Sequence, residues 1–563
     1  MARATLAIYG IKDRNSLEFP AYIHDHNLCL MQDGQVRQYL QLERYTRRKY
    51  DNRLDLFLEE LVGLGLLALP EEFDLVSVNA FVGNAFISQS GKLRFEAPIL
   101  SALGEALEPA QAYYQYSDWE GRTLCAYNCS HELAHIASNI AFYGSFRENS
   151  LLIHFDGAAS LSNFSAFHFH QGKLQLLEYG WEMKYLANFF NDNALSFAML
   201  GAKPGEHTSV PGKLMGYASW GRYDEGIAHW LFAHNYFKEY WHKEAEIVAS
   251  ARKELGVEVD SFDNQHDFWQ HVAATLQDIF TQKLIAHISA LQHQTRAQYL
   301  YYSGGCALNI VANTALIESG LFQEVFIPPC CNDSGLSLGA ACLLELRKGN
   351  TIRPHTAYLN NLGIEDKAVP ISDATIEATT QLLLRGSILG VCNGTAEAGP
   401  RALGNRSLIA LADDVVLARH LSQDIKKREW YRPIAPIMLT TVANTITTSP
   451  VNHLAKYMLL DYKIKPEYAG GLTGVIHANG TTRIQTLDNE HDNPFMFRLL
   501  SYLYARHQIL GLINTSFNVQ GQPIVHTAAD AIETSLKMGL DGLVLNHQLI
   551  TKDALATYKI LTR

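Results

Sequence analysis

Two stretches of the chain share one pattern, a short apolar strand followed by a hairpin. The first consists of Thr5–Gly10 and Asn27–Arg44, and two apolar runs of the latter segment meet at Asp33-Gly34. The second consists of Ser150–Gly157 and Phe164–Gly180, which contains a Gln-Gly turn. Glycine-containing turns between apolar runs predict β-hairpins. Because helical sequence separates the two stretches, we expect a strand–hairpin–helix unit that occurs twice.

The second part of the chain predicts a smaller α/β module. Residues 351–370 lack periodicity and are rich in polar and turn-forming residues, as linkers are. After them, Asp373–Leu384 predicts a helix and Ser387–Gly394 predicts a strand. We therefore expect a domain over residues 1–350, a linker over 351–370 and a domain over 371–563. The duplicated unit resembles the sugar-kinase and actin superfamily, so the expected fold class is α/β with an actin/sugar-kinase-like first domain.

Charge and cysteine content argue against several classes of protein. Lys and Arg number 46 and Asp and Glu 57, a net charge of −11, which gives no overall attraction to nucleic acid or anionic membranes. No apolar run reaches the ~20 residues of a membrane span, and charges interrupt the first thirty residues. The 8 cysteines are scattered without a CxxC motif. We expect a cytoplasmic protein with reduced thiols and neither nucleic acid nor membrane as partner.

The segment from His131 to His135 matches the pattern HExxH. Two histidines at positions i and i+4 of a helix face one way and can share a metal ion. In zinc proteases the intervening glutamate, here Glu132, is the general base. The alternative is a pair of histidines on an ordinary helix. No third ligand follows on a helix; instead a strand ends at Asp156, where a carboxylate can reach a nucleotide or a metal.

Two glycine-rich segments bear on nucleotide binding. Gly304-Gly305 lies in a turn after an apolar, aromatic run, and paired glycines let backbone N–H groups approach a phosphate. The alternative is a plain strand-to-helix turn. A Walker A motif is absent, because Gly212-Lys213 is followed by Leu214 and the earlier glycine is missing. If a nucleotide binds, it binds in another way.

The densest basic cluster of the chain lies in the second module, in Gly399–Ser407 and Lys426–Pro433. Arginine forks suit phosphate oxygens and lysine supplies a point charge, so an anion pocket is predicted here. The alternative is a solvated charged face. Further on, Asn514–Asn518 is a polar loop that can orient a polar substrate or serve as an ordinary turn.

Taken together and in this order, the motifs resemble the family of nodulation-protein and antibiotic O-carbamoyltransferases, which includes aminoglycoside and cephalosporin carbamoyltransferases. The similarity spans nearly the whole chain. The matching segments are His24-Asp25, Glu43–Lys49, the His131/His135 pair, Ser303–Asn309, Asn332–Ala341, Glu397–Ser407, Ile425–Pro436, His477–Leu487 and Ile513–Val525.

This resemblance implies two catalytic modules. The first is similar to tRNA threonylcarbamoyl-transfer proteins of the actin-like superfamily, and the second to the synthase that makes threonylcarbamoyl-adenylate. The implied reaction first converts ATP and carbamoyl phosphate into carbamoyl-adenylate. The carbamoyl group then passes to a hydroxyl of a small-molecule natural product, such as an antibiotic or another secondary metabolite. Iron(II) or another divalent first-row metal, and Mg with ATP, are the implied cofactors.

The resemblance also implies roles for individual residues. The metal ligands are His131, His135 and Asp333, and the catalytic pair is His24 with Asp25, the histidine acting as a base or orienting the acceptor. In the first domain, the adenylate is expected to contact Asp156, Lys213, Gly304, Gly305 and Asn309. In the second domain, ATP and carbamoyl phosphate are expected to contact Arg401, Asn405, Arg406, Lys426, Arg428, Arg432, Arg483, Asn514 and Ser516.

The chain also departs from the family pattern near the acceptor. His26-Asn27 follows the catalytic pair where small residues are usual, and Ala158–Ser160 replaces a Gly-acidic continuation after the strand that ends at Asp156. The sequence therefore does not identify the acceptor alcohol. A homodimer is a possible oligomeric state. The alternative functions are an HExxH zinc metallopeptidase, carbamoyl transfer in tRNA modification, and a sugar-kinase-like phosphotransferase.

Overall fold

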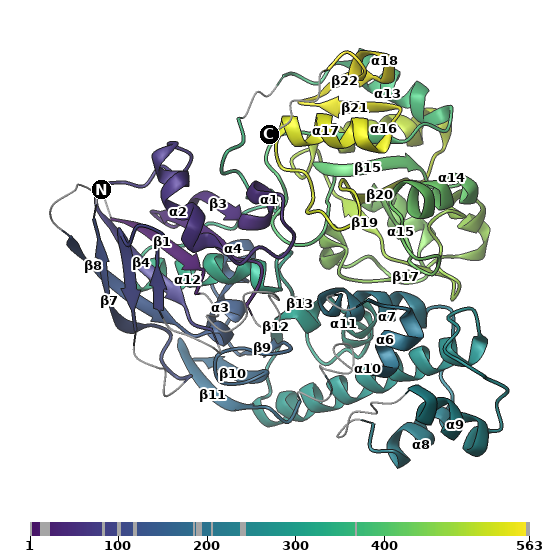
Figure 1. Cartoon of the computed structure of the whole chain (residues 1–563), viewed down its shortest axis with the longest axis horizontal. Coiled ribbons are helices and arrows are strands. Elements are labelled where there is room, and N and C mark those ends of the chain that lie inside the picture. Colours follow the sequence, from purple (N-terminus) through teal and green to yellow (C-terminus); the bar gives the residue numbers. More distant parts are fainter. Residues whose placement is uncertain are drawn as a thin grey trace.

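A computed structural model of the chain contains three main β-sheets with helices around them (Figure 1). It describes residues 3–11, 23–80, 85–97, 103–115, 121–183, 186, 194–203, 206–236, 244–365 and 369–558. None of the helices in these ranges combines the length and apolar character that crossing a membrane requires.

The first sheet has the strand order β3-β2-β1-β4-β8-β7-β6-β5. Its hairpin turns at Asp33-Gly34, where both residues have positive φ, as predicted. β1 pairs antiparallel with β2 and parallel with β4, and β4 pairs parallel with β8. The strands are β1 (Ala4–Tyr9), β2 (Asn27–Gln32), β3 (Gln35–Gln41), β4 (Phe73–Val78), β5 (Ala85–Ile87), β6 (Leu93–Glu96), β7 (Glu108–Tyr114) and β8 (Arg122–Cys129).

The second sheet repeats the core of the first. Its order is β11-β10-β9-β12-β13, with β9 antiparallel to β10 and parallel to β12, which is parallel to β13. Strand order and direction thus match those of β3-β2-β1-β4-β8, and the predicted duplication is confirmed. The strands are β9 (Ser150–Phe155), β10 (Phe164–His170), β11 (Lys173–Gly180), β12 (Tyr299–Ser303) and β13 (Glu324–Phe326).

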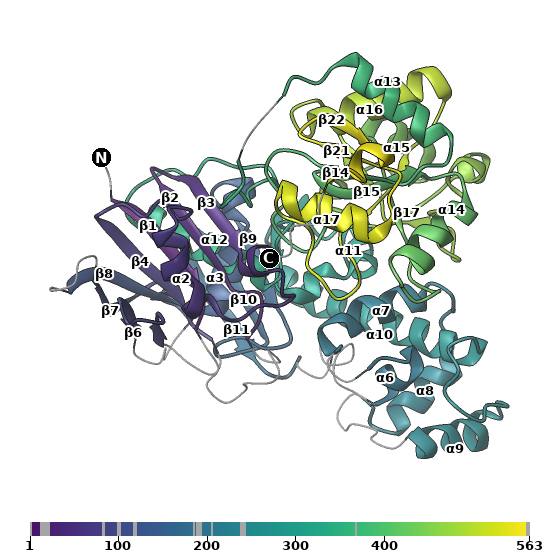
Figure 2. The ribbon, with the colours of Figure 1, turned by 45° about the horizontal axis from the view of Figure 1, so that its top comes forward.

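Two equivalent helices cross between these sheets, as Figure 2 shows from a second side. α3 (His131–Ala137) follows the last parallel strand of the first sheet, yet it contacts β9 and β12 of the second. α12 (Leu336–Arg347) follows the last strand of the second sheet, yet it contacts β1, β2 and β4 of the first. The two helices also contact each other. Each half of the duplication therefore covers the sheet of the other half.

The remaining helices of the first part lie around the two sheets, and a helical insertion separates β11 from β12. The insertion ends in a long helix, α10, along one side of the molecule (Figure 1). These helices are α1 (Leu42–Thr46), α2 (Leu54–Gly63), α4 (Ile140–Tyr143), α6 (Ala194–Leu200), α7 (Val210–Ala218), α8 (Glu225–Ala233), α9 (Glu244–Leu255), α10 (Asp267–Thr295) and α11 (Ile310–Glu318).

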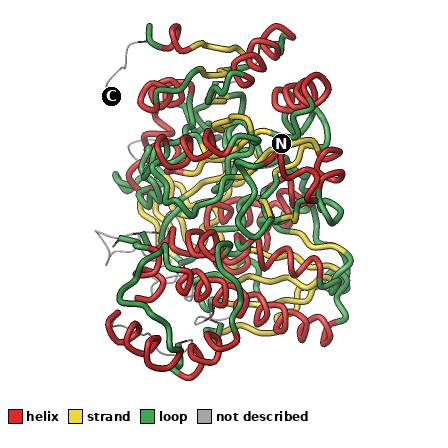
Figure 3. Tube along the Cα trace, turned by 90° about the vertical axis from the view of Figure 1, so that its right-hand side faces the viewer, coloured by secondary structure: helices red, strands yellow, loops and turns green. Residues whose placement is uncertain are grey.

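The third sheet has the order β19-β16-β20-β15-β14-β21-β22, and a short ribbon of β17 and β18 lies apart from it. The helices around it, with the intervening loops, are visible in the tube view of Figure 3. The expected helix Asp373–Leu384 is α13. The other elements are β14 (Leu389–Cys392), β15 (Arg406–Leu411), α14 (Val415–Arg419), β16 (Ala435–Leu439), α15 (Thr440–Ile446), β17 (Tyr462–Lys463), β18 (Thr481–Thr482), β19 (Gln485–Leu487), α16 (Pro494–His507), β20 (Leu512–Ser516), α17 (Ala528–Met538), β21 (Gly542–Leu545), β22 (Gln548–Thr551) and α18 (Lys552–Leu555).

The segment that connects the second and third sheets packs closely over much of its length. Ile352 and Leu362 are buried, the Arg353 N–H donates to the Gly34 carbonyl, and Asn360 forms a β-bridge with Ala396. Polar and turn residues therefore mark a change of direction here, while the apolar ones anchor the segment. The domain boundaries at 350 and 371 remain a prediction.

Candidate active site

The first candidate site lies where the parallel strands of both N-terminal sheets end. β1 ends at Tyr9, β8 leads into α3, β9 ends one residue before Asp156, and β12 leads into Gly304. Loops that follow parallel strands meet at the same edge of a sheet, which is where ligands bind in open α/β folds. Segments far apart in the sequence are thereby brought together.

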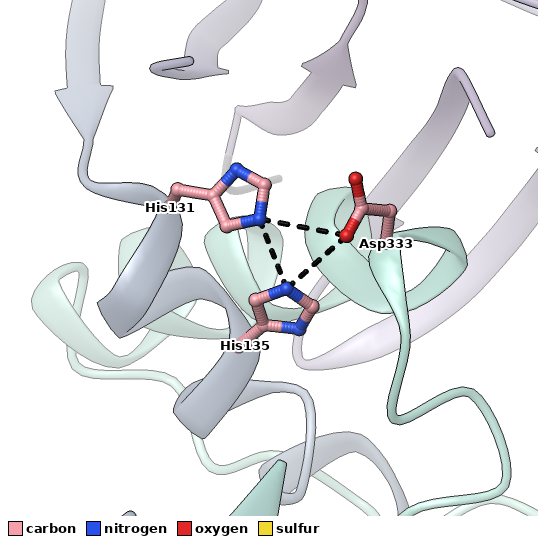
Figure 4. A group of neighbouring side chains, drawn as sticks. All are labelled: His131, His135 and Asp333. Atoms are coloured by element: carbon pink, nitrogen blue, oxygen red, sulfur yellow. Dashed lines mark hydrogen bonds and ion pairs between the residues drawn. The ribbon is translucent and has the colours of Figure 1, made fainter. Parts of the chain in front are cut away.

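At this edge, His131, His135 and Asp333 converge (Figure 4). The two histidine Nε2 atoms are 3.0 Å apart, and they lie 3.5 and 3.3 Å from Oδ1 of Asp333. Ser130 caps α3 and thereby fixes the helix start that carries the histidines. All three side chains are buried, and their donor atoms lie within 4.8 Å of one another. Two imidazoles and a carboxylate can hold a divalent first-row ion.

Close helix packing puts Asp333 in this place. A Cβ atom at Gly339 of α12 would lie 1.8 Å from the Ala134 carbonyl oxygen of α3, so only glycine permits this approach. The Tyr9 hydroxyl donates to Oδ2 of Asp333 at 3.0 Å, and the Asn27 amide donates to its backbone oxygen at 2.9 Å. Although burial acts to raise the pKa of Asp333, the nearby histidines hold it well below its usual range.

The predicted catalytic pair lies beside the cluster. His24 Nδ1 is 3.0 Å from Oδ2 of Asp25 and 3.9 Å from Oδ2 of Asp333, and Asn332 donates to Asp25 at 3.3 Å. Burial acts to lower the pKa of His24, but the hydrogen bond with Asp25 and the carboxylate charges raise it to about 10. With these carboxylates as its neighbours, the imidazole is protonated at neutral pH, which favours orienting an acceptor over removing its proton. Its role as a base stays a prediction.

Glu132 of the HExxH pattern is engaged elsewhere. Its Oε1 accepts the N–H groups of Leu161 and Ser162 at 2.6 and 3.0 Å. The carboxylate therefore holds the loop between β9 and β10. A general base of a zinc peptidase must instead reach a water on the metal.

Asp156 links the cluster of His131, His135 and Asp333, the metal-site cluster, to the glycine-rich turn. Its Oδ2 accepts the Gly305 N–H at 2.6 Å and lies 3.4 Å from His135 Nε2. Gly304 has φ +102°, and a Cβ there would lie 2.1 Å from the Phe155 carbonyl oxygen. The turn after β12 is thus pressed against the end of β9, which requires glycine at this position, and the Gly304 N–H donates to the Cys331 carbonyl at 2.8 Å.

The other two residues predicted to contact the adenylate are occupied by protein partners. Asn309 caps α11, and its amide exchanges hydrogen bonds of 3.1 Å with Gln277 of α10. Lys213 lies on α7 in the helical insertion, where its ammonium pairs with Glu429 at 2.7 Å and Glu206 at 3.0 Å. The structure thus brings Lys213 to the basic cluster of the second module. The assignment of both residues to the adenylate stays a prediction.

The second candidate site lies at one end of the third sheet. β15 begins and β20 ends there, since the pair is antiparallel with Ser407 opposite Ser516. β16 and the parallel β19 also begin near this end. The segments that precede β15, β16 and β19 therefore deliver their cations to one place. The cations are Arg401, Lys426, Arg428, Arg432 and Arg483.

These cations are shielded from water to different degrees, since Lys426 is buried and the four arginines are half-buried. Burial, followed by the charges of Arg401, Arg428 and Arg432, holds the pKa of Arg483 well below its usual range. Burial and Arg432 lower the pKa of Arg428 to about 9. The carboxylate of Glu429, 3.6 Å from Arg432, is shared with Lys213. Mutually repelling, desolvated cations of this kind are stabilised by a bound polyanion.

Lys426 and the polar loop form one hydrogen-bonded unit. The Lys426 ammonium donates to the Ser516 backbone oxygen and to Oδ1 of Asn518, the latter at 2.8 Å, and Ser516 Oγ donates to the same Oδ1 at 2.7 Å. Asn514 donates to Gln485 and the Ala402 backbone, while its Oδ1 is buried without a hydrogen-bond partner.

Two predicted ligand residues of this module serve the framework. Arg406 is fully buried and donates to four backbone oxygens, those of Asn393, Gly394, Asn405 and His526. Asn405 donates to the Thr395 carbonyl and accepts from Asn493. Their polar groups hold the loop that presents Arg401, and their direct contact with ATP or carbamoyl phosphate stays a prediction.

Comparison with known proteins decides the family. Residues 121–342 match the family described as Carbamoyltransferase N-terminus, and residues 380–552 match Carbamoyltransferase C-terminus. The chain belongs to the carbamoyltransferase family. Nodulation protein NolNO of Sinorhizobium fredii is 28% identical, covering 96% of this chain and 80% of that protein. Nodulation protein U of the same organism is 26% identical, covering 91% and 95% respectively.

Among solved structures, full-length HypF in its phosphate- and nucleotide-bound form is similar with a TM-score of 0.30 and 13% identity, covering 61% of this chain and 55% of that one. The matches to both carbamoyltransferase family models identify the chain as a carbamoyltransferase enzyme. Its duplicated α/β architecture follows from its own strand order.

In this carbamoyltransferase the two candidate sites adjoin. A Cβ at Gly399 would lie 2.3 Å from the Pro329 carbonyl oxygen, so the loop with Arg401 presses on the loop that carries Asp333. The Arg44 side chain donates to the Gly399 carbonyl at 2.9 Å and ties a third segment to this contact.

Sequence reasoning missed three residues of the first site, Tyr9, Asn27 and His154. Tyr9 and Asn27 hold Asp333, and the ring of His154 stacks on that of His135 with centroids 5.1 Å apart. The spacing of His154 and Asp156 was the available signal, because residues i and i+2 of a strand share a face.

Proposed function

We propose that this carbamoyltransferase works in two steps. In the second module, carbamoyl phosphate, ATP and water give carbamoyl-adenylate, pyrophosphate and phosphate. At the first site, the carbamoyl carbon is attacked by a hydroxyl of a small-molecule natural product. The C–O bond to the adenylate breaks, AMP leaves, and the hydroxyl proton is released.

The observation that carries the activation step is the set of half-buried arginines around Arg428. Burial, followed by the charge of Arg432, lowers the pKa of Arg401 and Arg428, and the pKa of Arg483 is lowered by burial and by the other arginines. Binding ATP beside carbamoyl phosphate crowds several negative charges, so converging cations are needed to neutralise them. Lys426, which is buried against Ser516 and Asn518, and the Ser516 hydroxyl would add a point charge and a donor.

For the transfer step, His131, His135 and Asp333 would hold iron(II) or another divalent first-row ion, and Mg would accompany ATP. A bound ion supplies positive charge beside the phosphate of the adenylate. The chain's own residues provide the rest. The Gly304-Gly305 turn would lie beside the adenylate, with the Gly305 N–H held by Asp156 and the Gly304 N–H by the Cys331 carbonyl. His24 would orient the acceptor hydroxyl, and Asp25 would hold its imidazole.

The alternatives differ in their products. A zinc peptidase would cleave peptides without ATP, and the engagement of Glu132 with Leu161 and Ser162 argues against it. A phosphotransferase would release ADP instead of AMP. An enzyme that transfers carbamoyl groups to tRNA would bind tRNA with an affinity that falls steeply as salt is raised. A chain of net charge −11 does not favour binding to such a polyanion.

The deciding experiment measures pyrophosphate release from ATP with and without carbamoyl phosphate, in the absence of an acceptor. We expect release that requires carbamoyl phosphate and is lost in Arg432→Ala. Arg498→Ala is the matched control, since Arg498 pairs with Asp373 on α13, away from the basic cluster. Release that is independent of carbamoyl phosphate, or ADP as the product, would refute the proposal.

A further inference from the structure

His154 is a third histidine beside the metal-site cluster, and the reaction proposed above does not use it. It lies on β9 two residues before Asp156, which directly follows the strand, and the donor atoms of the two side chains lie within 4.8 Å of each other. Its ring stacks on that of His135, with centroids 5.1 Å apart and an interplanar angle of 24°. The side chain is fully buried.

Hydrogen bonding leaves one nitrogen of His154 available. Nδ1 lies 3.2 Å from Oγ of Ser165, its register partner on β10. Nε2 is buried and has no hydrogen-bond partner. When Nδ1–H donates to Ser165, Nε2 carries an unused lone pair. A histidine that ligates a metal through one ring nitrogen characteristically donates a hydrogen bond from the other. Buried polar atoms in folded proteins almost always have a bonding partner, so an unpartnered Nε2 requires an explanation.

His154 completes a second group of potential ligands. The donor atoms of His135, His154 and Asp156 lie within 4.8 Å of one another, as do those of His131, His135 and Asp333. Among the described residues, no such group contains both His131 and His154, whose ring centroids are 6.3 Å apart. First-row ions bind nitrogen and oxygen at about 2.0–2.2 Å. One ion therefore does not serve both groups from one position.

We propose that this centre binds a second divalent cation, held by Nε2 of His154 and by Asp156, next to the cation held by His131 and Asp333, with His135 between the two positions. The inference rests on the metal centre proposed above and deepens it. Imidazole with carboxylate suits Mn(II), Fe(II) or Zn(II). Two divalent ions carry four positive charges, and Asp25, Asp156 and Asp333 supply three negative ones. The centre would therefore keep a net positive charge that attracts a phosphate. Paired ions of this kind are typically about 3.5–4 Å apart.

The test counts ions in the full chain. The protein is stripped with chelator, dialysed against Mn(II), and analysed for bound manganese and by electron paramagnetic resonance. We expect two ions per chain and an exchange-coupled spectrum for the wild type, and one uncoupled ion for His154→Gln. His131→Gln should also lose one ion, and the double variant both. The matched control is His168→Gln on β10, whose ring is half-buried and stacks on His170; it should keep two.

Each outcome separates this inference from the metal centre itself. A single ion in the wild type, or an unchanged count in His154→Gln, overturns the second position and leaves the first in place. Absence of tightly bound Mn(II) in the wild type overturns the metal centre and this inference together. If His154→Gln does not fold, as judged by thermal melting, the wild-type count and the coupling in its spectrum decide the matter alone.

Discussion

Replacing Gly339 by alanine tests whether helix packing sets the metal-site geometry. The added Cβ would lie 1.8 Å from the Ala134 carbonyl oxygen, about 1.6 Å short of the 3.4 Å at which ordinary contact begins. Both atoms belong to helix backbones, so a side-chain rotation does not relieve the clash. α12 and α3 must therefore move apart. The required displacement is about half of the distance between Asp333 Oδ1 and the two histidine Nε2 atoms, which is 3.3–3.5 Å.

Two consequences follow from this separation. Overpacking of this type destabilises a fold by about 1–3 kcal/mol. Widening the ligand cluster moves Asp333 out of reach of an ion shared with His131 and His135, because ion–ligand distances of about 2.0–2.2 Å tolerate little change. We expect metal affinity to fall by about 10–100-fold, the range typical of disturbed ligand orientation.

The assay is Mn(II) binding by equilibrium dialysis, together with thermal melting. Gly63→Ala is the control, because Gly63 ends α2 and a Cβ there meets no atom within 4 Å. It should leave affinity unchanged and melt at the same or a slightly higher temperature. Gly339→Ala with wild-type affinity and melting temperature would show that helix contact does not set the geometry of the cluster.

Three further predictions address separate features. Arg428→Met should raise the melting temperature of the ligand-free protein, since it removes a desolvated cation that its neighbours repel, while abolishing pyrophosphate release; a lower melting temperature contradicts this. Glu132→Gln should keep metal binding and carbamoyl transfer within a few-fold of the wild type, because the amide oxygen still accepts from the N–H groups of Leu161 and Ser162. Loss of all activity with the metal retained would instead indicate that Glu132 is a general base. Burial lowers the pKa of His526 to about 3, so the unfolded chain binds more protons below pH 6.5 and stability falls as pH drops from 6.5 toward 3. His526→Asn should reduce that slope in chemical denaturation, and an unchanged slope would contradict the assignment.

Local features of the fold were predictable, because short-range chemistry determines them. The Asp33-Gly34 turn needs positive φ at both positions, which those residue types tolerate, and the helix Asp373–Leu384 begins at a Ser372 cap. The duplication followed from finding the same turn signal twice.

The site was predictable in part. The family resemblance placed Asp333 with His131 and His135, which no local pattern connects across about two hundred residues. Residue type alone does not assign Arg406, since a guanidinium serves buried carbonyls as well as phosphates, and only the fold shows which protein groups surround it. Lys213 illustrates the same limit, because its partner Glu429 comes from a different module.

The exchange of covering helices between the two halves has a consequence for biosynthesis. The strands of the first sheet are complete once Cys129 has been made, but the helix that covers them begins at Leu336. At about 5–20 residues per second, the ribosome needs roughly 10–40 s to bridge that interval. During this time α12 has not been synthesised, so the apolar face of the first sheet that α12 covers in the folded protein is exposed. We expect ribosome-bound chains shorter than residue 336 to be protease-sensitive in this sheet and to engage chaperones, with protection appearing only after α12 emerges.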